Sequence, residues 1–487
     1  MDLAKIINGL EIEYIKGEKA LEINEIRYDS RDVEKGDLFI CIQGFKTDGH
    51  KYIDDVIDKE ANVVVIDKEL DSYDNSITYI KVADSRKAMA VLAKNFFENP
   101  LKEIDLIGVT GTNGKTTTTY LIKEILNQSG YKTGLIGTIE VFNGEESINA
   151  SRTTPESLDI YRYLAKMREK GVKYTVMEVS SHALALNRVD TMDFKAAVFT
   201  NLTQDHLDYH KTMDRYATEK VKLFKKLKSD GTAIINNDDN YAQLFKDTTQ
   251  QDIITYGIEK ESELQPNEIE LSLEGVKFNL NDFKYNLNLT GKFNIYNSLA
   301  AVGVAKSLGI KEDLIKKSLE GIEGIPGRFE TINRGQDFTV IVDYAHTPDS
   351  MINVLRAVQH FEHNDIIVVF GCGGERDKKK RPIMGEIAVQ YSDYVVVTTD
   401  NPRSEVPETI IEEIVEGIKE SEYSTPYTIE VEREDAIYEA VGKAKKGDVV
   451  VIIGKGHETY QVFADKTIDF NDKAVAKAAI QKKLSDI

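Results

Sequence analysis

The residues from Gly111 to Thr117 read Gly-Thr-Asn-Gly-Lys-Thr-Thr and combine the groups that bind phosphate. An apolar run at Ile104–Thr110, which predicts a strand, precedes them, and a helical pattern at Thr116–Asn127 follows. A glycine-rich turn at a helix N-terminus offers backbone N–H groups and the positive end of the helix dipole to an anion. Lys115 adds a charge for the β- and γ-phosphates, and the Thr116 hydroxyl suits Mg²⁺. We therefore predict an ATP site here.

The loop departs from the usual phosphate-loop spacing at one position. That pattern places a glycine at position 109, where this chain has Val109, and the upstream glycine is Gly108. The alternative interpretation is a tight strand–helix turn with an incidental lysine. The predicted strand before the loop and the helix after it favour phosphate binding.

Polar residues follow two further predicted strands. Glu178 lies at the end of the run Tyr174–Val179, and a polar segment, residues 200–210, follows the run Ala196–Asn201. Ligands bind at the carboxyl ends of strands in an open parallel sheet, and a carboxylate there can hold Mg²⁺. Each residue alone could instead cap a helix or lie in a solvated loop, as Asp205 could. Together they favour a nucleotide–metal site.

The elements that must position these groups alternate along the chain. Most strand-like runs are continuously apolar, which is typical of parallel strands covered by helices on both faces. With helical patterns between them, including Pro407–Lys419, they predict doubly wound α/β domains. Two segments interrupt the pattern: a helical stretch ends at Pro100 within residues 99–104, and glycines flank Pro326 within residues 324–329. They predict three domains, at residues 1–99, 100–328 and 329–487. The remaining predicted strands are Ala61–Asp67, Thr232–Asn236, Phe338–Asp343, Asp365–Gly371, Tyr394–Thr398 and Asp448–Gly454.

Composition excludes several classes of protein. With 62 Lys+Arg against 82 Asp+Glu, the net charge is −20, which argues against binding nucleic acid or an anionic membrane. The two cysteines, Cys41 and Cys372, support neither a disulfide framework nor a cysteine-rich zinc site. No signal peptide or membrane-spanning run is recognisable. We expect a cytoplasmic protein and, by default, a monomer.

Several motifs follow one another along nearly the whole chain. They are GVTGTNGKTTTT (108–119), MEVSSHAL (177–184), TNLTQDHLDYH (200–210), TGKFNIYN (290–297), IPGRFE (325–330), VDYAHTPDS (342–350), GCGGERDKKKRP (371–382), DNPR (400–403) and GKGHE (454–458). Together they identify the chain as similar to the Mur ligase family of ATP-dependent amide-bond-forming enzymes. In that family the Gly108 spacing is the usual form. The chain most resembles the members that add the third residue of the peptidoglycan stem peptide.

The resemblance implies a fold and a first substrate site. It implies a small α/β UDP-binding domain, a central P-loop ATPase domain with a mostly parallel sheet, and a C-terminal Rossmann-like domain. The family also has a glutamine where this chain has Leu186, so one substrate contact differs. The residues that match contacts to UDP-N-acetylmuramoyl-L-alanyl-D-glutamate are Ser30, Thr153, Thr154, Ser180 and Arg188, with Gln43, Gly44 and Phe45 as less specific matches.

The resemblance also implies an ATP and metal site. Lys220 matches a lysine that relatives carry as a carbamate, although by itself the sequence reads as a solvated helix lysine beside Glu219. Lys115, Glu178, His206 and Lys220 are the expected catalytic group. The expected Mg²⁺ ligands are Thr116, Glu178, His206 and carbamylated Lys220. The expected ATP contacts are Gly111, Thr112, Asn113, Gly114, Lys115, Thr116, Thr117, Asn294, Arg328 and Asp343.

In the third domain the resemblance implies a site for meso-2,6-diaminopimelate. This amino acid differs from lysine by a second carboxylate, which a guanidinium can bind through two hydrogen bonds. Arg403 is therefore the expected determinant of specificity, and Glu458 can accept a hydrogen bond from the far ammonium. The full expected set is Arg376, Asp400, Asn401, Pro402, Arg403, Gly454 and Glu458.

The implied reaction joins diaminopimelate to the D-glutamate of the UDP-linked substrate through an acyl phosphate. Three alternatives stay open at this point. The first is an L-lysine-adding ligase of the same family, against which Arg403 argues. The second is a folylpolyglutamate synthetase-like ligase, against which the UDP-type N-terminal region argues. A nonenzymatic P-loop switch leaves DNPR and GKGHE unexplained.

Overall fold

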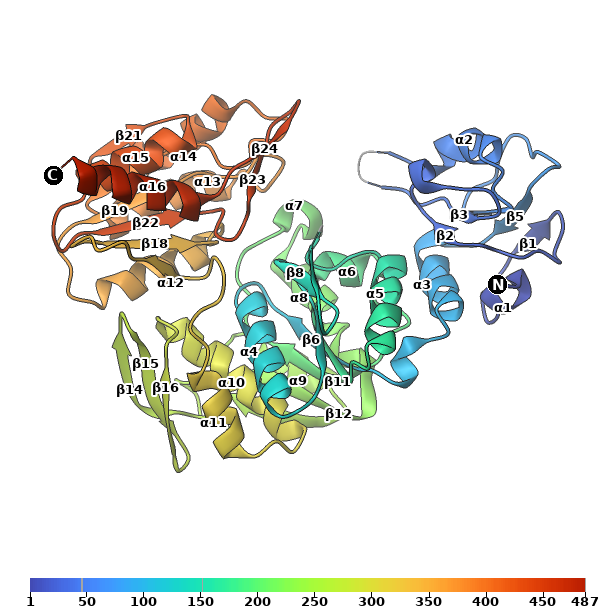
Figure 1. Ribbon diagram of the computed structural model, residues 1–487, viewed down its shortest axis with the longest axis horizontal. Helices are drawn as coiled ribbons and strands as arrows, with labels where there is room; N and C mark the ends of the chain where they lie inside the picture. The colour runs from blue at the N-terminus through green and yellow to red at the C-terminus, as the bar shows by residue number, and fades with distance from the viewer. Residues whose placement is uncertain (45–46, 151, 487) are drawn as a thin grey trace. The chain divides into compact units, whose positions relative to one another are not determined.

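The computed structural model describes residues 1–44, 47–150 and 152–486 (Figure 1). The described residues form two compact units. The first comprises residues 1–108, 130–197 and 222–231, and the second comprises residues 109–129, 198–221 and 232–487. The predicted α/β class is confirmed, because helices alternate with strands along most of the chain.

The N-terminal part of the first unit contains a mixed five-stranded sheet of order β1-β5-β4-β3-β2. Strands β2 to β5 pair in parallel, whereas β1 is an antiparallel edge strand. Every residue of β3, β4 and β5 is buried, as expected for strands covered on both faces. The elements are α1 (Leu3–Ile6), β1 (Tyr14–Lys16), β2 (Ile26–Arg27), β3 (Leu38–Ile40), α2 (Ile53–Asp58), β4 (Val63–Ile66), β5 (Thr78–Lys81) and α3 (Ser85–Phe96).

The central sheet has eight strands in the order β13-β12-β11-β6-β10-β7-β8-β9. Strands β7 and β10 pair in parallel, as do β12 and β13, whereas β8 and β9 add an antiparallel extension. Its strands are β6 (Asp105–Thr110), β7 (Thr133–Ile136), β8 (Glu140–Phe142), β9 (Ser147–Asn149), β10 (Tyr174–Glu178), β11 (Phe194–Phe199), β12 (Leu227–Asn236) and β13 (Asp252–Tyr256). The helices of this region are α4 (Lys115–Gln128), α5 (Ser157–Glu169), α6 (Ser181–Ala185), α7 (Leu207–His210), α8 (Met213–Val221) and α9 (Ala242–Thr248).

A small antiparallel sheet, not predicted from the sequence, follows in the second unit. Its strands are β14 (Asn267–Ser272), β15 (Gly275–Leu280) and β16 (Phe283–Leu287). Alternate residues of β16 are buried, so its pattern has the period of a half-exposed strand rather than of a continuous apolar run. Helices α10 (Lys292–Ser307) and α11 (Glu312–Glu320) come next, and α10 is buried along most of its length.

The C-terminal part of the second unit is a six-stranded sheet of order β17-β18-β22-β19-β20-β21. Its strands pair in parallel, except that the edge strand β17 is antiparallel to β18. Helices α12 (Pro348–Gln359), α13 (Lys380–Tyr391) and α14 (Pro407–Glu420) pack in one core, and α15 (Arg433–Lys443) and α16 (Asp472–Ser485) in another (Figure 1). The strands are β17 (Glu330–Ile332), β18 (Thr339–Asp343), β19 (Ile366–Phe370), β20 (Tyr394–Val397), β21 (Tyr427–Ile429) and β22 (Val449–Ile453), with a separate hairpin of β23 (Tyr460–Val462) and β24 (Thr467–Asp469).

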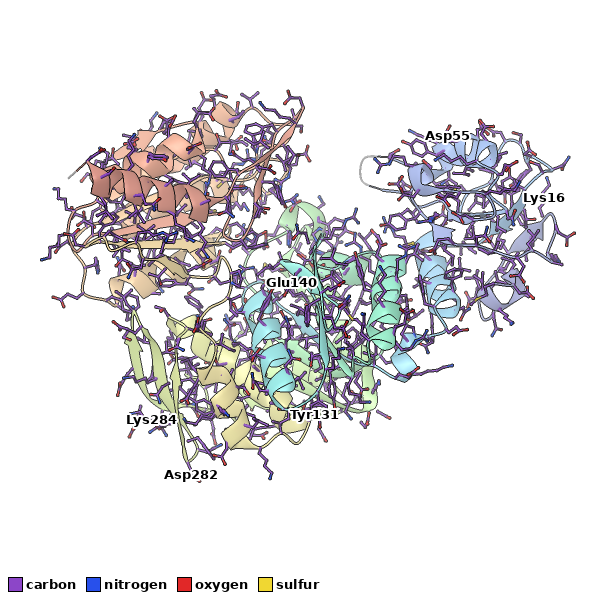
Figure 2. The ribbon with its side chains drawn as sticks, in the orientation of Figure 1. Lys16, Asp55, Tyr131, Glu140, Asp282 and Lys284 are labelled. Carbon is purple, nitrogen blue, oxygen red and sulfur yellow. The ribbon has the colours of Figure 1, made fainter. Side chains whose placement is uncertain are left out.

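All nine strands predicted from apolar runs are present, with ends shifted by a few residues. The breaks at residues 99–104 and 324–329 contain no α-helix or β-strand longer than a bridge, although the three domain ranges stay a prediction. Charged side chains such as Lys16, Asp55, Asp282 and Lys284 are exposed (Figure 2). No helix in the described ranges has both the length and the apolar character that crossing a membrane requires.

Candidate active site

The phosphate loop connects β6 to α4 and is held from below by the segment that follows β11. The Thr112 N–H donates to the Asn201 carbonyl (2.8 Å), and the Asn113 N–H donates to the Asn201 side chain (2.9 Å). Gly111 and Gly114 have φ angles of 148° and 84°, so both lie where side chains are strained. A Cβ at Gly111 would also overlap the hydroxyl of Thr200. Glycine is thus required at both positions of the predicted loop.

Two lysines converge on the carbonyl side of this loop. Lys115 Nζ donates to the carbonyls of Gly111 (3.0 Å) and Thr112 (2.7 Å), and Lys220 Nζ donates to Gly111 (2.7 Å). Burial and then the charge of Lys115 hold the pKa of Lys220 well below its usual value. The interpretation of Lys220 as a solvated helix lysine is therefore wrong. Tyr216, Ala217, Lys220 and Val221 are the buried residues of α8, and that helical spacing was the signal that could have shown it.

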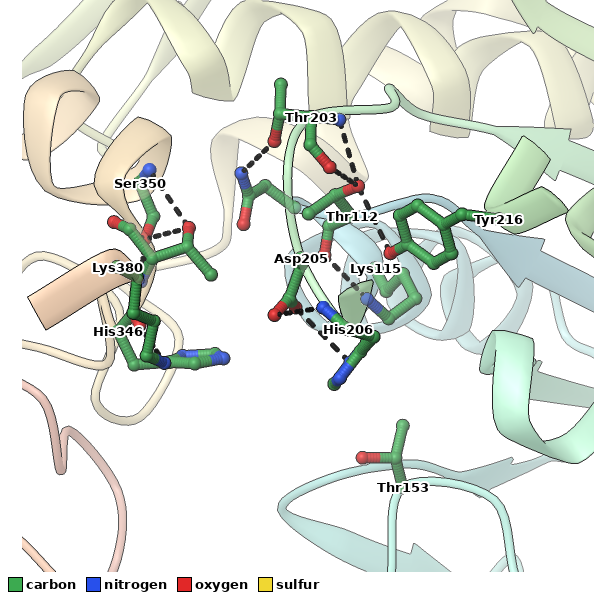
Figure 3. A network of polar contacts seen from close by, with 12 residues as sticks. Thr112, Lys115, Thr153, Thr203, Asp205, His206, Tyr216, His346, Ser350 and Lys380 are labelled. Carbon is green, nitrogen blue, oxygen red and sulfur yellow. Dashed lines mark hydrogen bonds and ion pairs between the residues drawn. The ribbon is translucent and has the colours of Figure 1, made fainter. Parts of the chain in front are cut away.

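A polar network extends from the loop to the segment before α7 (Figure 3). The Thr112 hydroxyl accepts from the Thr203 N–H (3.0 Å) and contacts the Tyr216 hydroxyl (3.2 Å). His206 Nε2 lies 3.2 Å from Asp205 Oδ2, and its backbone N–H donates to the same carboxylate (2.9 Å). Although burial opposes it, the charge of His206 lowers the pKa of Asp205 to about 2. Asp205, which a helix cap could have explained, instead anchors the predicted metal ligand His206.

Two residues of the C-terminal part of the second unit contact the loop. Asp349, at the start of α12, accepts from Asn113 Nδ2 (2.7 Å), and Arg328 Nη2 donates to the Thr116 hydroxyl (2.9 Å). The guanidinium of Arg328 lies over the ring of Tyr344, 4.6 Å from its centre, and its buried Nε has no hydrogen-bond partner among the residues that the structure describes. Arg328, an expected ATP contact, thus lies beside the phosphate loop, whereas Asp349 was missed although it stands in the segment VDYAHTPDS (342–350).

The other predicted nucleotide contacts are engaged within the protein. Asp343 accepts backbone N–H groups from Phe329 (2.7 Å) and Ala345 (2.6 Å), and burial raises its pKa. Asn294 donates to the Thr290 carbonyl (2.8 Å) and accepts from Asn297 (2.9 Å). Asp343 therefore holds the backbone in place at Phe329 and at Ala345.

Within the first unit, Glu178 lies buried at the end of β10. Its two carboxylate oxygens accept from the backbone N–H (2.8 Å) and the hydroxyl (3.0 Å) of Thr138, which follows β7. The Thr138 hydroxyl is also 3.0 Å from that of Thr153. Thr154 donates to the Glu178 carbonyl (2.8 Å) and accepts from the Ser180 N–H (3.0 Å). The structure therefore brings Thr153, Thr154 and Ser180 together beside Glu178.

Arg188 joins this group through the Thr154 carbonyl, and it also pairs with Glu156, a residue that the motifs did not indicate. Its guanidinium donates to the Thr154 carbonyl (2.9 Å) and to Glu156 (2.8 Å), and Glu156 also pairs with Arg86 (2.7 Å) and Arg152 (2.7 Å). Burial opposes ionisation, but Arg188, Arg86 and Arg152 keep the pKa of Glu156 below its usual value. One carboxylate thus neutralises part of the charge of three arginines.

Ser30 lies apart from these threonines in the sequence but in the same unit. It begins a 3₁₀ turn capped by Asp29, and its carbonyl accepts from Lys59 (2.7 Å). A cavity beside this turn is lined by Tyr28, Asp29 and Asp159, among others, and the Tyr28 hydroxyl donates to Asp159 (2.6 Å). Leu186 follows the last residue of α6 and is half-buried. Gln43 and Gly44 lie in a loop, whereas Phe45 lies outside the described residues.

The predicted amino-acid site gathers at the carboxyl ends of β19, β20 and β22. Arg403 is half-buried and donates to the Gly374 carbonyl (2.6 Å), while Arg376 is exposed on the neighbouring loop. Burial, and next to it the charge of Arg376, lowers the pKa of Arg403. Both arginines lie beside Gly373, where a Cβ would be 2.9 Å from Arg403 Nη1 and 3.8 Å from Arg376 Cγ. A pair of neighbouring guanidinium groups is a ready receptor for a carboxylate.

The acidic side of the site is held by a hydrogen-bonded cluster. Glu458 Oε2 accepts from Asn401 Nδ2 (2.8 Å) and from the buried Lys455 Nζ (2.9 Å). Asp400 accepts from the Asn401 N–H (2.6 Å), and a Cβ at Gly454 would approach Asp400 Oδ2 to 2.6 Å. Pro402, which follows Asn401 in the sequence, is also buried. The structure therefore brings DNPR and GKGHE together, and sequence reasoning missed Lys455.

The donor groups present suit Mg²⁺, a hard cation that prefers oxygen ligands. The Thr116 hydroxyl and the Glu178 carboxylate are buried oxygen donors. Burial lowers the pKa of Lys220, which favours the neutral amine, the form that can react with carbon dioxide. No cluster of three or more His, Cys, Asp or Glu side chains arranged to hold a metal occurs in the part of the chain that the structure describes.

A phosphate loop in a largely parallel sheet, followed by a Rossmann-like sheet, defines a modular nucleotide-binding α/β enzyme. Three family models match the chain: "Mur ligase family, catalytic domain" over residues 22–97, "Mur ligase middle domain" over 109–305, and "Mur ligase, glutamate ligase domain" over 327–456. The chain belongs to the Mur ligase family, whose members are ATP-dependent ligases.

Individual relatives match over nearly the full length. The chain is 47% identical to a UDP-N-acetylmuramoyl-L-alanyl-D-glutamate–2,6-diaminopimelate ligase of Syntrophomonas wolfei, covering 99% of this chain and 100% of the relative. It is 45% identical to the enzyme of the same name from Clostridium tetani, with the same coverage. A solved structure of that name matches with a TM-score of 0.68, 31% identity and 99% coverage of both chains. A MurF ligase of Thermotoga maritima in complex with ADP, 18% identical, shares the fold (TM-score 0.65; 95% of this chain, 98% of that one).

Proposed function

We propose that the chain is the ligase that joins meso-2,6-diaminopimelate to the D-glutamate of UDP-N-acetylmuramoyl-L-alanyl-D-glutamate, with ATP converted to ADP and phosphate. This reaction belongs to cytoplasmic peptidoglycan precursor synthesis. The full-length identity to ligases of that name supports it. The observation that carries the choice of amino acid is the pair of neighbouring guanidinium groups, Arg376 and Arg403, beside the carboxylate of Glu458.

In the proposed reaction the phosphate loop and Lys115 bind ATP. The N-terminus of α4 would face the phosphates, and Arg328, bonded to Thr116, would add a second positive charge. Thr116, Glu178, His206 and carbamylated Lys220 would hold Mg²⁺. The ion, when bound, neutralises charge on the transferred phosphoryl group. Catalysis by this chain is then mainly positioning and charge neutralisation.

The substrate carboxylate attacks the γ-phosphorus of ATP, and ADP leaves. The amine of diaminopimelate then attacks the carbonyl carbon of the acyl phosphate, inorganic phosphate leaves, and the amine loses a proton as the amide forms. Thr153, Thr154, Ser180 and Arg188 are proposed to hold the muramoyl peptide, with Ser30 at the uridine end. Because Arg188 already pairs with Glu156, the substrate would share or replace that contact.

At the amino-acid site the far end of diaminopimelate carries one carboxylate and one ammonium. Arg403 and Arg376 suit the carboxylate, and Glu458 suits the ammonium. Lysine offers only the ammonium, so it would leave the half-buried guanidinium of Arg403 without a carboxylate partner, which is costly. Diaminopimelate should therefore be preferred over lysine.

One assay tests the proposal. Purified protein is supplied with ATP, Mg²⁺, UDP-N-acetylmuramoyl-L-alanyl-D-glutamate, and either meso-diaminopimelate or L-lysine, and the products are separated and weighed by mass spectrometry. We expect the diaminopimelate adduct and stoichiometric ADP. Efficient lysine addition with no diaminopimelate addition would reject the specificity, and ATP turnover without any adduct would reject the ligase function.

A further inference from the structure

A fully buried ion pair lies beneath the amino-acid site and takes no part in the reaction described above. Arg433 Nε and Nη2 donate to Asp472 Oδ1 and Oδ2, both at 2.8 Å, and neither side chain is exposed to solvent. The two residues are 39 positions apart in the sequence and belong to different helices. Burying two charges costs several kcal/mol per ion before their attraction is counted, so such a pair is weak evidence for stability alone.

The position of Arg433 is unfavourable for the helix that carries it. It is the first residue of α15, where the helix dipole repels a cation, whereas Asp472, the first residue of α16, is favourably placed. Local preference therefore does not explain Arg433. Residues that break a local rule are expected where the tertiary structure or the function needs them.

The remaining bonds of Arg433 show what the pair holds. Its guanidinium donates to the carbonyls of Ile453 (3.0 Å) and Thr399 (3.4 Å). Ile453 ends β22 and directly precedes Gly454, and Thr399 directly precedes Asp400. In the sheet, β22 and β20 flank β19 on either side. One side chain thus ties together the two strand ends from which the GKGHE and DNPR segments depart.

The electrostatics of the site agree with this arrangement. Burial alone would lower the pKa of Arg433, yet Asp472 and, beyond it, Asp400 and Glu458 raise it. Neither Arg433 nor Asp472 can reach a ligand, because both are enclosed by protein.

We infer that Arg433 and Asp472 are positioning residues of the amino-acid site: they set the spacing between the DNPR and GKGHE segments on which recognition of the amino acid depends. The inference rests on the proposed function of that site. A lysine at position 433 would keep the charge but could not form the same fork to Asp472 and still reach both carbonyls. The two segments would then separate or shift, and a misplacement of about 1 Å can cost up to ~100-fold in activity.

The test uses Arg433→Lys and Asp472→Asn in the full-length protein. The KM and kcat are measured separately for diaminopimelate, ATP and the UDP-linked substrate, together with the melting temperature. We expect the KM for diaminopimelate to rise by about 10- to 100-fold, with the KM of the other two substrates unchanged. The matched control is Ile437→Ala, which removes a buried side chain of the same helix α15 and should lower the melting temperature without changing the KM for diaminopimelate.

Each other outcome overturns the inference. Folded variants with an unaltered KM for diaminopimelate, an equal rise for all three substrates, or a KM effect reproduced by Ile437→Ala would assign the pair to general stability. The same conclusion follows if neither variant folds. Failure of the wild-type protein to form the diaminopimelate adduct is a different result, because it rejects the proposed function itself.

Discussion

The replacement Arg403→Gln tests the recognition of the second carboxylate most directly. Among the described residues, the contacts of Arg403 use Nη1, which donates to Gly374 and lies 3.4 Å from the Asn401 carbonyl. The edge formed by Nε and Nη2 can therefore receive a carboxylate through two parallel bonds. Glutamine is shorter than arginine by two bonds, so it loses the bond from Nη1 to the Gly374 carbonyl as well as the charge and the fork.

The expected size of the effect follows from the partial burial of Arg403. A hydrogen bond to a charged group contributes ~1.5–3 kcal/mol. Because Arg403 is half-buried, water and salt weaken this contribution less than they weaken that of a fully exposed ion pair. Since ~1.4 kcal/mol is a factor of ten, kcat/KM for diaminopimelate should fall by about 10- to 150-fold. The value for L-lysine should stay near its wild-type level or rise, because lysine never made these bonds.

The assay measures phosphate release with each amino acid in turn, at saturating ATP and UDP-linked substrate. Arg356→Gln is the matched control, because Arg356 is an exposed arginine of the same sheet domain that donates to the Tyr391 hydroxyl. The control should keep both kcat/KM values. If Arg403→Gln leaves the ratio of diaminopimelate to lysine unchanged, the argument for two guanidinium groups as the carboxylate receptor is refuted.

Three further predictions concern the other parts of the site. Lys115→Ala should weaken ATP binding at least about tenfold by titration calorimetry, since it removes a charged phosphate contact; unchanged affinity would exclude the loop. Lys220→Met should abolish ligation yet raise the melting temperature at neutral pH, because it replaces a buried amine with an apolar chain of similar length; full activity would exclude a role for the carbamate. The pKa of Glu156 is lower in the folded protein than in the unfolded chain, where it is about 4.3. Its stabilising effect is therefore present above about pH 4.3 and is lost as the pH falls through the folded-state pKa. In acid unfolding followed by circular dichroism, Glu156→Gln should therefore lose stability less steeply than the wild type, and identical curves would contradict this.

Local features of the fold and the site were predictable from the sequence. The nine apolar runs became strands because a continuous run of branched residues suits a strand buried on both faces, and the loop from Gly111 to Thr117 formed where two glycines are sterically required. The strands β14 to β16 were not predicted, because their alternating or polar pattern resembles that of surface segments. Antiparallel β8 and β9 were missed for the same reason, and β9 is exposed throughout.

Residues outside the motifs were predictable only where the spacing carried information. Lys220 is on the buried side of α8, which helical periodicity could have shown. Glu156 gave no such signal, because a single carboxylate in a polar segment is equally consistent with a cap or with solvent, and its partner Arg188 is 32 positions away. Asp205 and Asp349 stand in recognised motifs, but those motifs did not indicate that they contact His206 and Asn113.

The chemical groups available to this protein can be read from short stretches of the chain: a phosphate loop, carboxylates at strand ends, and arginines in two C-terminal motifs. Those features are local, since steric limits, helix dipoles and residue types act over a few neighbouring positions. Which charges are buried together depends instead on how the chain folds. The pairing of Arg433 with Asp472 depends on how two helices begin against one sheet, and no pattern along the chain encodes that distance. The interaction energy of two charges also depends on how much solvent is excluded around them, which is a property of the folded chain alone.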